Sequence, residues 1–254
     1  MSKPHNAELV KSMWDQYHPV YMECILKDRP DYHQFFADGG VDDQFEFRLL
    51  GDVSGLTLLD TCCACDASQA FSWTNLGAIV TACDISPVAI RIAEENARKI
   101  GCDVRFQVAD AQTLLPIADN AFDIVYATYI CWYADVEAAF RTWHRVLKPG
   151  GRLLFTSSHP VTNCLDVQDG AITLTWNYHN REPDYYTFDA TPAGRKYGID
   201  MNLPTVNFHH TLSDIVNGIA AAGFRIERMA ESEAEQTGEP LHGLPGAIAI
   251  VARK

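Results

Sequence analysis

The sequence is poor in positive charge. Lys and Arg together number 20, against 33 Asp and Glu, and the formal net charge is −13. Proteins that bind nucleic acids displace counterions with clustered basic side chains, and no such cluster is visible in this sequence. The composition therefore argues against DNA, RNA or an anionic membrane as a partner, and it leaves a small molecule as the favoured one.

Long apolar runs and an export signal are also lacking. No uninterrupted apolar stretch approaches the length of a membrane span, and residues 1–6 lack the apolar core of a signal peptide. We therefore expect a cytoplasmic protein, either a monomer or a homodimer. In that compartment the eight cysteines are expected to be reduced thiols rather than a disulfide framework.

Glycine is missing from the turn where a nucleotide-binding α/β protein normally has it. Residues 58–69 read as a buried strand followed by a turn, and three cysteines occupy that turn. Only glycine adopts left-handed backbone angles without a steric cost, so the turn must use ordinary angles or carry strain. The pair Asp66 and Gln69 fits a capping box for the helix expected next.

The N-terminal residues 1–50 are expected to form a helical cap. Apolar residues recur at helical spacing over residues 7–27, although Pro19 should break or kink that helix. Residues 45–50 suggest a second, short helix.

Residues 51–158 alternate between short apolar runs and helical segments. Pro87 near the start of one helix and Gly101 just beyond its end mark its boundaries. Such alternation predicts an α/β fold, a doubly wound and mainly parallel sheet covered on both faces. We expect strands over 56–62, 79–85, 104–108, 122–128 and 152–157, and helices over 67–76, 87–100 and 136–147.

The alternation fails over residues 159–211, which are rich in aromatic residues, Pro, Gly and Asp. A connection of this length indicates an inserted cap or lid rather than a loop. Residues 171–178 and 185–189 are candidates to pair as a hairpin. Residues 212–254 complete the core with a helix over 212–222 and strands over 224–229 and 247–252.

Two carboxylates end neighbouring strands of the expected core. Asp84 ends the second strand and can accept hydrogen bonds from both hydroxyls of a ribose, while Asp110 ends the third and can accept from an adenine amine. In an open parallel sheet, ligands bind at this edge, beside the first strand. These positions predict a nucleoside site.

The core resembles the class I S-adenosylmethionine-dependent methyltransferases, in the small-molecule branch called methyltransferase type 11 or 25. The resemblance spans about residues 56–158 and resumes near the C-terminus. A dehydrogenase that binds NAD could share Asp84 but is not expected to carry the last of the segments that match the family. These segments are 58–60, 80–86, 108–111, 122–125 and 146–153.

The resemblance implies a seven-stranded sheet with an antiparallel last strand, and S-adenosylmethionine as the cofactor. It also implies methyl transfer to an O, N, S or C atom of a small molecule, and the aromatic cap suggests an aromatic or heterocyclic one. The family's glycines are replaced here by Cys62, Ala64 and Asp66. The residues expected to bind the cofactor are Asp60, Cys62, Cys63, Ala64, Asp84, Ile85, Asp110, Ala111, Thr128 and Tyr129.

Three histidines are candidates to take a proton from the acceptor, because they follow core strands or precede the last helix: His159, His209 and His210. Each could equally be a capping or packing residue. Thr211 beside them is a candidate N-cap. The residues expected to contact the substrate are Tyr17, Tyr21, Trp132, Tyr133, His159, Trp176 and His210, although Tyr17 and Tyr21 could instead belong to the core face of their helix.

Two other interpretations remain open. Cys62, Cys63 and Cys65 could serve thiol redox or bind a metal or metalloid in a non-methylating relative, because a thiol at a helix N-terminus is activated. Arsenite methyltransferases are similar in general terms, but their cysteine pattern is not matched. No second Cys/His pair has zinc spacing, so we expect no metal. Alternatively, the cap is an interaction surface, which would need neither cofactor nor pocket.

Overall fold

The computed structural model describes residues 6–115, 117–233 and 241–254. Its centre is a seven-stranded sheet in the order β10-β11-β5-β4-β1-β2-β3. The strands are β1 (Thr57–Asp60), β2 (Ile79–Asp84), β3 (Arg105–Val108), β4 (Phe122–Thr128), β5 (Leu147–Ser158), β10 (Arg225–Glu233) and β11 (Pro245–Arg253). Strands β1 to β5 pair in parallel, and β11 is antiparallel to both β5 and β10. The predicted α/β sheet with an antiparallel last strand is confirmed.

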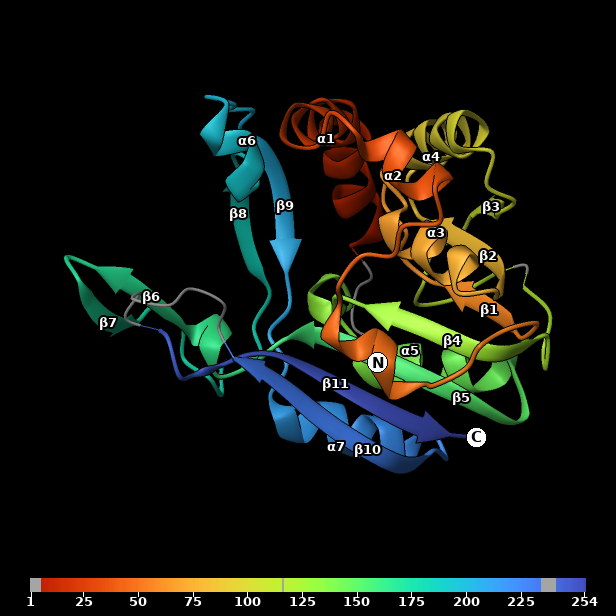
Figure 1. Ribbon diagram of the computed structural model, residues 1–254. Coiled ribbons are helices and arrows are strands. Elements are labelled where there is room, and N and C mark those ends of the chain that lie inside the picture. Colours follow the sequence, from red (N-terminus) through yellow and green to blue (C-terminus); the bar gives the residue numbers. More distant parts are fainter. Residues whose placement is uncertain (1–5, 116, 234–240) are drawn as a thin grey trace.

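Helices cover both faces of this sheet (Figure 1). Successive residues of β1 point to opposite faces, so Leu58 belongs to one apolar core and Leu59 to the other, and both are fully buried. The first core is closed by α3 and α4 and the second by α5 and α7. These helices are α3 (Ser68–Asn75), α4 (Pro87–Ile100), α5 (Val136–Val146) and α7 (Leu212–Ala221).

The boundaries of α4 show why the sequence predicted it correctly. The Ser86 hydroxyl accepts a hydrogen bond from Ala89 N at 3.0 Å, and Pro87 occupies the first turn. At the other end Gly101 adopts φ +77, the left-handed angle that closes a helix. The expected N-cap at Thr211 is also confirmed, since it forms a capping box with Asp214 at the start of α7.

The N-terminal segment contributes α1 (Ala7–Asp28), α2 (Tyr32–Ala37) and the short helix η1 (Phe45–Leu49). Of the break or kink predicted at Pro19, the break is wrong, because α1 continues through this residue. Pro19 removes one N–H donor from the helix, but its neighbours Tyr17 and His18 are buried and hold this part of α1 against the protein.

The inserted segment forms two hairpins rather than the one predicted. Strand β6 (Leu165–Gln168) pairs with β7 (Ala171–Leu174), and β8 (Asp184–Phe188) pairs with β9 (Leu203–Asn207) across α6 (Pro192–Lys196). The predicted pairing of 171–178 with 185–189 is therefore wrong. The physical reason lies at Asp169 and Gly170, which both have positive φ and form the tight turn between β6 and β7. Figure 1 shows β8, β9 and α6 beside α1, and β6 and β7 projecting from the body.

The remaining connections are two short helical turns, η2 (Ile130–Trp132) after β4 and η3 (Thr162–Cys164) after β5. Within the described residues, no helix combines the length and the apolar character that crossing a bilayer requires.

The turn between β1 and α3 contains no glycine, yet two of its residues adopt the left-handed backbone angles that glycine normally provides. Ala64 and Ala67 adopt φ +55 and +53, so the turn uses left-handed angles and carries their steric cost. The capping box predicted for Asp66 and Gln69 is wrong. Helix α3 begins at Ser68, and Ala67, which has no side-chain donor or acceptor, occupies its N-cap position.

Surrounding helices hold this strained turn in place. The Cys65 thiol donates to the His18 carbonyl of α1 at 3.3 Å, and Asn96 of α4 donates to the Cys65 carbonyl at 3.1 Å. The Tyr32 hydroxyl of α2 donates to the Asp66 carbonyl. Strained backbone persists where its surroundings determine it in this way.

Substitution of Ala64 by glycine is expected to stabilise the fold. Left-handed angles cost a residue with a Cβ about 1–2 kcal/mol, while glycine's freedom in the unfolded chain offsets about 0.4–1 kcal/mol of the gain. Urea denaturation of Ala64→Gly should therefore show a free energy of unfolding raised by up to about 1 kcal/mol.

Gly101→Ala is the matched control, because Gly101 has φ +77 and open space around an added Cβ. This variant should lose about 1 kcal/mol of stability. A loss of stability in Ala64→Gly, as for an ordinary alanine, would contradict the assigned backbone.

Candidate functional site

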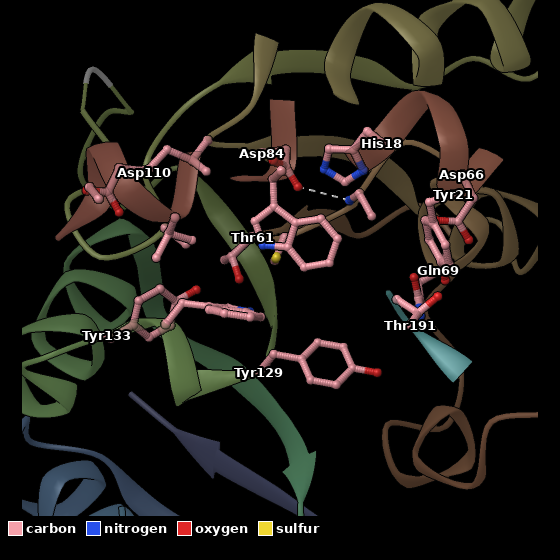
Figure 2. Close-up of a pocket in the computed structure, with 18 of the residues that line it drawn as sticks. His18, Tyr21, Thr61, Asp66, Gln69, Asp84, Asp110, Tyr129, Tyr133 and Thr191 are labelled. Carbon is pink, nitrogen blue, oxygen red and sulfur yellow. Dashed lines mark hydrogen bonds between the residues drawn. The ribbon is translucent and has the colours of Figure 1, made fainter. Parts of the chain in front are cut away.

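A cavity of about 550 Å³ opens at the carboxyl ends of β1, β2, β3 and β4, under helix α1 (Figure 2). Its volume lies within the range of small-molecule sites, about 300–1,000 Å³. The core contributes Thr61, Cys62, Ala64, Asp66, Gln69, Asp84, Ile85, Asp110, Ala111, Tyr129, Trp132, Tyr133 and Ser158. Helix α1 and the inserted segment contribute Ala7, Val10, Trp14, His18, Tyr21, Thr191 and Pro192.

Asp84 lies at the end of β2 and is buried. Its Oδ2 accepts a hydrogen bond from Ala64 N at 3.1 Å, and its Oδ1 accepts one from Ser86 N at 2.8 Å. Burial raises the pKa of this carboxyl to about 6, against the opposing effect of these two donors. A carboxylate offers about four lone-pair positions, so two remain for ligand hydroxyl groups.

Asp60 lies behind the turn rather than on the cavity wall. Its Oδ1 accepts from Cys62 N at 3.2 Å, whereas the buried Oδ2 has no hydrogen-bond partner among the described residues. Burial raises the pKa of Asp60 to about 7, and the nearby Asp84 adds to this rise. A buried carboxylate oxygen without a partner is costly unless a ligand supplies the donor.

The loop after β3 forms another part of the wall. Asp110 accepts from Gln112 N at 2.9 Å through its Oδ1, and Ala111 follows it. Trp143 of α5, which is fully buried, donates from Nε1 to the Ala111 carbonyl at 2.9 Å. The second apolar core thereby fixes the position of this loop.

Aromatic side chains cover the cavity from two directions. Trp14 and Tyr21 belong to α1, and Tyr129, Trp132 and Tyr133 follow β4. Trp14 packs edge-on against Trp132 with ring centroids 5.7 Å apart, which joins the two groups. Tyr129 adopts φ +53, and a tyrosine rarely holds left-handed backbone outside a functional site.

His18 is a site residue that the sequence analysis missed. Its ring is buried, stacks on Trp14 at 4.9 Å, and has no hydrogen-bond partner at either nitrogen among the described residues. Burial lowers the pKa of His18 to about 4, so the ring is neutral near pH 7. Little in the sequence pointed to His18, since a histidine within an amphipathic helix pattern looks like any core residue.

Several other wall residues were also missed, namely Thr61, Asp66, Gln69, Ser158 and Thr191. Asp66 and Gln69 were assigned to helix capping instead, and the other three carry no motif. One feature of the sequence could have identified Asp66 as a wall residue. It stands at a position where the family has glycine, and a side chain there must point either into the core or into the cavity.

The predicted cofactor residues divide into two groups. Those that line the cavity are Cys62, Ala64, Asp84, Ile85, Asp110, Ala111 and Tyr129. Asp60 and Cys63 lie behind the wall as buried residues, and Thr128 lines a smaller cavity that adjoins the first at Gln69, Tyr129 and Ser158. The cofactor roles of all ten stay predictions.

The predicted substrate residues divide in the same way. Tyr21, Trp132 and Tyr133 line the cavity. Tyr17 is fully buried outside it, where its hydroxyl bonds Thr191 Oγ1 at 2.7 Å and joins α1 to the inserted segment. Trp176 stacks on His209 with centroids 4.0 Å apart and also lies outside.

The three predicted catalytic histidines do not line the main cavity. His159 is buried with Nε2 3.0 Å from Glu231 Oε1. His209 and His210 line a second cavity of about 250 Å³, and His210 Nε2 lies 2.8 Å from the Tyr133 carbonyl. Ser158 lines both cavities, so the two adjoin there. Catalytic roles for these histidines stay predictions.

The cysteines of the first turn show no sign of activation. Cys63 and Cys65 are buried, and burial raises the pKa of both thiols and that of Cys62. A reactive thiol needs the opposite shift. Within residues 6–115, 117–233 and 241–254, no group of His, Cys, Asp or Glu side chains is arranged to hold a metal ion.

Comparison with known proteins places the core in a family. Residues 59–155 match the model of a methyltransferase domain, Methyltransf_11. The chain is 34% identical over 124 residues to phosphoethanolamine N-methyltransferase 3 of Arabidopsis thaliana, which covers 48% of this chain. The match spans only 25% of that relative's length.

Solved structures share the fold. An S-adenosylmethionine-dependent methyltransferase from Mesorhizobium loti superposes with a TM-score of 0.63 at 24% identity, covering 86% of this chain and 100% of that one. A [4+2]-cyclase superposes with a TM-score of 0.62 at 20% identity, covering 100% of this chain and 97% of that one.

Residues 59–155 thus match a methyltransferase domain, and the chain shares its fold and sheet order with S-adenosylmethionine-dependent methyltransferases of known structure.

Proposed function

We propose that this protein is an enzyme that transfers the methyl group of S-adenosylmethionine to a small aromatic or heterocyclic molecule. The observation that carries the proposal is the cavity under α1, where Asp84, Asp110 and the turn at Ala64 converge. The structural likeness to a [4+2]-cyclase shows that this fold also supports other chemistry, so the proposal rests on the site rather than on the fold.

The residues present fit the cofactor. Asp84 retains acceptor capacity for the ribose hydroxyls, and Asp110 lies at the far side of the cavity for the adenine. The Oδ2 of Asp60, which has no hydrogen-bond partner among the described residues, adds negative charge behind the turn that favours an ammonium group in the cavity. Ala64 is small enough for a ligand to approach the backbone.

The bound cofactor supplies an already activated sulfonium methyl group. The protein's part is to align the acceptor and to exclude water, which Trp14, Trp132 and Tyr133 can do from both sides of the cavity. The acceptor is proposed to occupy the second cavity, which adjoins the first at Ser158. There we propose that His209 receives a proton from it.

Calorimetric titration with S-adenosylhomocysteine tests cofactor binding. We expect one site per chain and an affinity weakened at least tenfold in Asp84→Asn, because an amide cannot accept hydrogen bonds at both of its terminal atoms. Asp38→Asn is the matched control, since Asp38 is exposed at the end of α2. Absence of binding by the folded wild-type protein would overturn the proposal.

The affinity for S-adenosylhomocysteine should fall as the pH is lowered. The pKa values of Asp60 and Asp84 in the free protein are raised to about 7 and about 6, so both carboxyls take up protons between pH 8 and pH 5. Protonated Asp60 attracts an ammonium less well, and protonated Asp84 accepts hydrogen bonds from the ribose hydroxyls less well. His18, with a pKa of about 4, does not titrate in this range. We expect binding about tenfold weaker at pH 5 than at pH 8; an unchanged affinity would contradict these assignments.

Methyl transfer itself can be sought with a labelled methyl donor and a panel of small phenols, aromatic amines and heterocyclic thiols. With any accepted substrate, His209→Gln should lower kcat at least tenfold while the affinity for S-adenosylhomocysteine stays within about twofold. We expect kcat and the affinity to respond differently because His209 lines the second cavity and not the one proposed to hold the cofactor. An unchanged kcat would remove the proton-accepting role.

A further inference from the structure

A small polar cavity of about 150 Å³ lies at the ends of β4 and β5, beside the cavity proposed to hold the cofactor. The two cavities share Gln69, Tyr129 and Ser158 in their walls. The small cavity also shares Ser157 and Ser158 with the second cavity, where the methyl acceptor is proposed to bind. We call it the Glu46 pocket, and its polar wall residues include Glu46, Tyr126, Thr128, Tyr129, Thr156 and Ser232.

Glu46 brings a carboxyl group to the wall of this pocket. It belongs to the short helix η1 and is buried, which is rare for a glutamate. The Tyr126 hydroxyl donates a hydrogen bond to Glu46 Oε1 at 3.0 Å. The ring of Tyr126 is itself held by the first apolar core, where it packs edge-on against Phe47 and Trp73. The core thus fixes the position of the carboxyl group at the pocket.

Glu46 also lies close to the junction with the cofactor cavity. Burial is the main reason why the pKa of Tyr129 is raised to about 12, and the charge of Glu46 adds to this rise. Tyr129 lines both cavities, so a group that enters the Glu46 pocket from the cofactor side passes this residue. The carboxyl group is therefore within reach of a molecule bound beside the cofactor.

The chemistry of the pocket wall favours an ammonium group as its ligand. Burial raises the pKa of Glu46, against hydrogen bonds from the backbone and from Tyr126, and a cation bound beside it would favour the ionised form. Hydrogen bonds between charged groups are about twice as strong as neutral ones. An ammonium group has three donors, and the hydroxyl oxygens of Thr128, Thr156 and Ser232 are further acceptors on the same wall.

The size of the Glu46 pocket suits a short substituent rather than a ring. A water molecule in the liquid takes roughly 30 Å³, so a cavity of about 150 Å³ holds only a few non-hydrogen atoms. The second cavity, at about 250 Å³, is the larger of the two that meet at Ser157 and Ser158. A molecule that spans both would place its ring in the second cavity and a short chain in the Glu46 pocket.

We propose that the Glu46 pocket binds a protonated amino group of the methyl acceptor, so that the substrate is an aromatic or heterocyclic molecule with a short aminoalkyl chain. The inference rests on the proposed function, which places the acceptor in the second cavity. Glu46 determines specificity by pairing with the ammonium group, while Tyr126 holds the carboxylate in place. The ammonium group has no lone pair, so the methyl group goes to another atom of the molecule, on the side of His209.

The test compares three phenols that differ only at the end of a two-carbon chain opposite the phenol hydroxyl. The chain ends in an ammonium group, a hydroxyl group or a methyl group. Their binding to the complete chain, saturated with S-adenosylhomocysteine, is measured by calorimetry at pH 7.5. We expect the ammonium compound to bind about tenfold more tightly than the methyl compound and about threefold more tightly than the hydroxyl compound. Equal affinities, a preference for either neutral compound, or binding of none of the three would overturn the proposal.

Glu46→Gln tests whether Glu46 causes the preference. Glutamine keeps the size of the side chain and an acceptor for Tyr126, but it removes the charge. The affinity for the ammonium compound should fall about tenfold, while that for the methyl compound stays within about twofold. Glu23→Gln is the matched control, since Glu23 is exposed on α1, and it should leave all three affinities unchanged. A preference unchanged in Glu46→Gln would overturn the assignment to Glu46.

Two features of this design keep its outcomes distinct. The comparison of the three phenols on wild-type protein needs no variant, so the proposal is tested even if Glu46→Gln fails to fold. Wild-type protein that binds S-adenosylhomocysteine but does not prefer the ammonium compound would overturn this inference alone. Wild-type protein that does not bind S-adenosylhomocysteine would overturn the proposed function and this inference together.

Discussion

The hydrogen bond from Ala64 N to the Asp84 carboxylate is the contact on which the site depends. It joins the turn after β1 to the end of β2, and Ala64 donates it from a left-handed backbone. Contacts from α1, α2 and α4 to Cys65 and Asp66 hold that backbone. The turn can thus keep its left-handed backbone without glycine, because contacts from three helices offset the local strain.

Helix α1 serves two purposes that constrain each other. Its Tyr17 is bound to Thr191, and its His18 carbonyl accepts from Cys65, so the helix is fixed both to the inserted segment and to the turn. The same helix carries Trp14 and Tyr21, which line the cavity. A ligand must therefore enter past aromatic residues, in a cavity whose described walls carry carboxylates and a neutral histidine.

The sequence predicted the core well because each of its elements carries a local signal. Helix α4 has a proline, a serine cap and a closing glycine, and Asp84 ends the mostly apolar strand β2. The inserted segment was predicted less well, since the pairing of β8 with β9 joins residues far apart in the chain. His18 was missed because its function depends on what α1 covers, and Asp66 because its capping pattern matched a helix that starts one residue later.

A crystal structure of the complex with S-adenosylhomocysteine tests the central claim most directly. The account predicts the ribose hydroxyls within hydrogen-bond distance of Asp84, the adenine beside Asp110, and the amino group of the tail at Asp60 or Asp66. It also predicts that Ala64 keeps its left-handed backbone in the complex. A ligand bound elsewhere, or a first turn that rearranges and breaks the bond between Ala64 and Asp84, would contradict it.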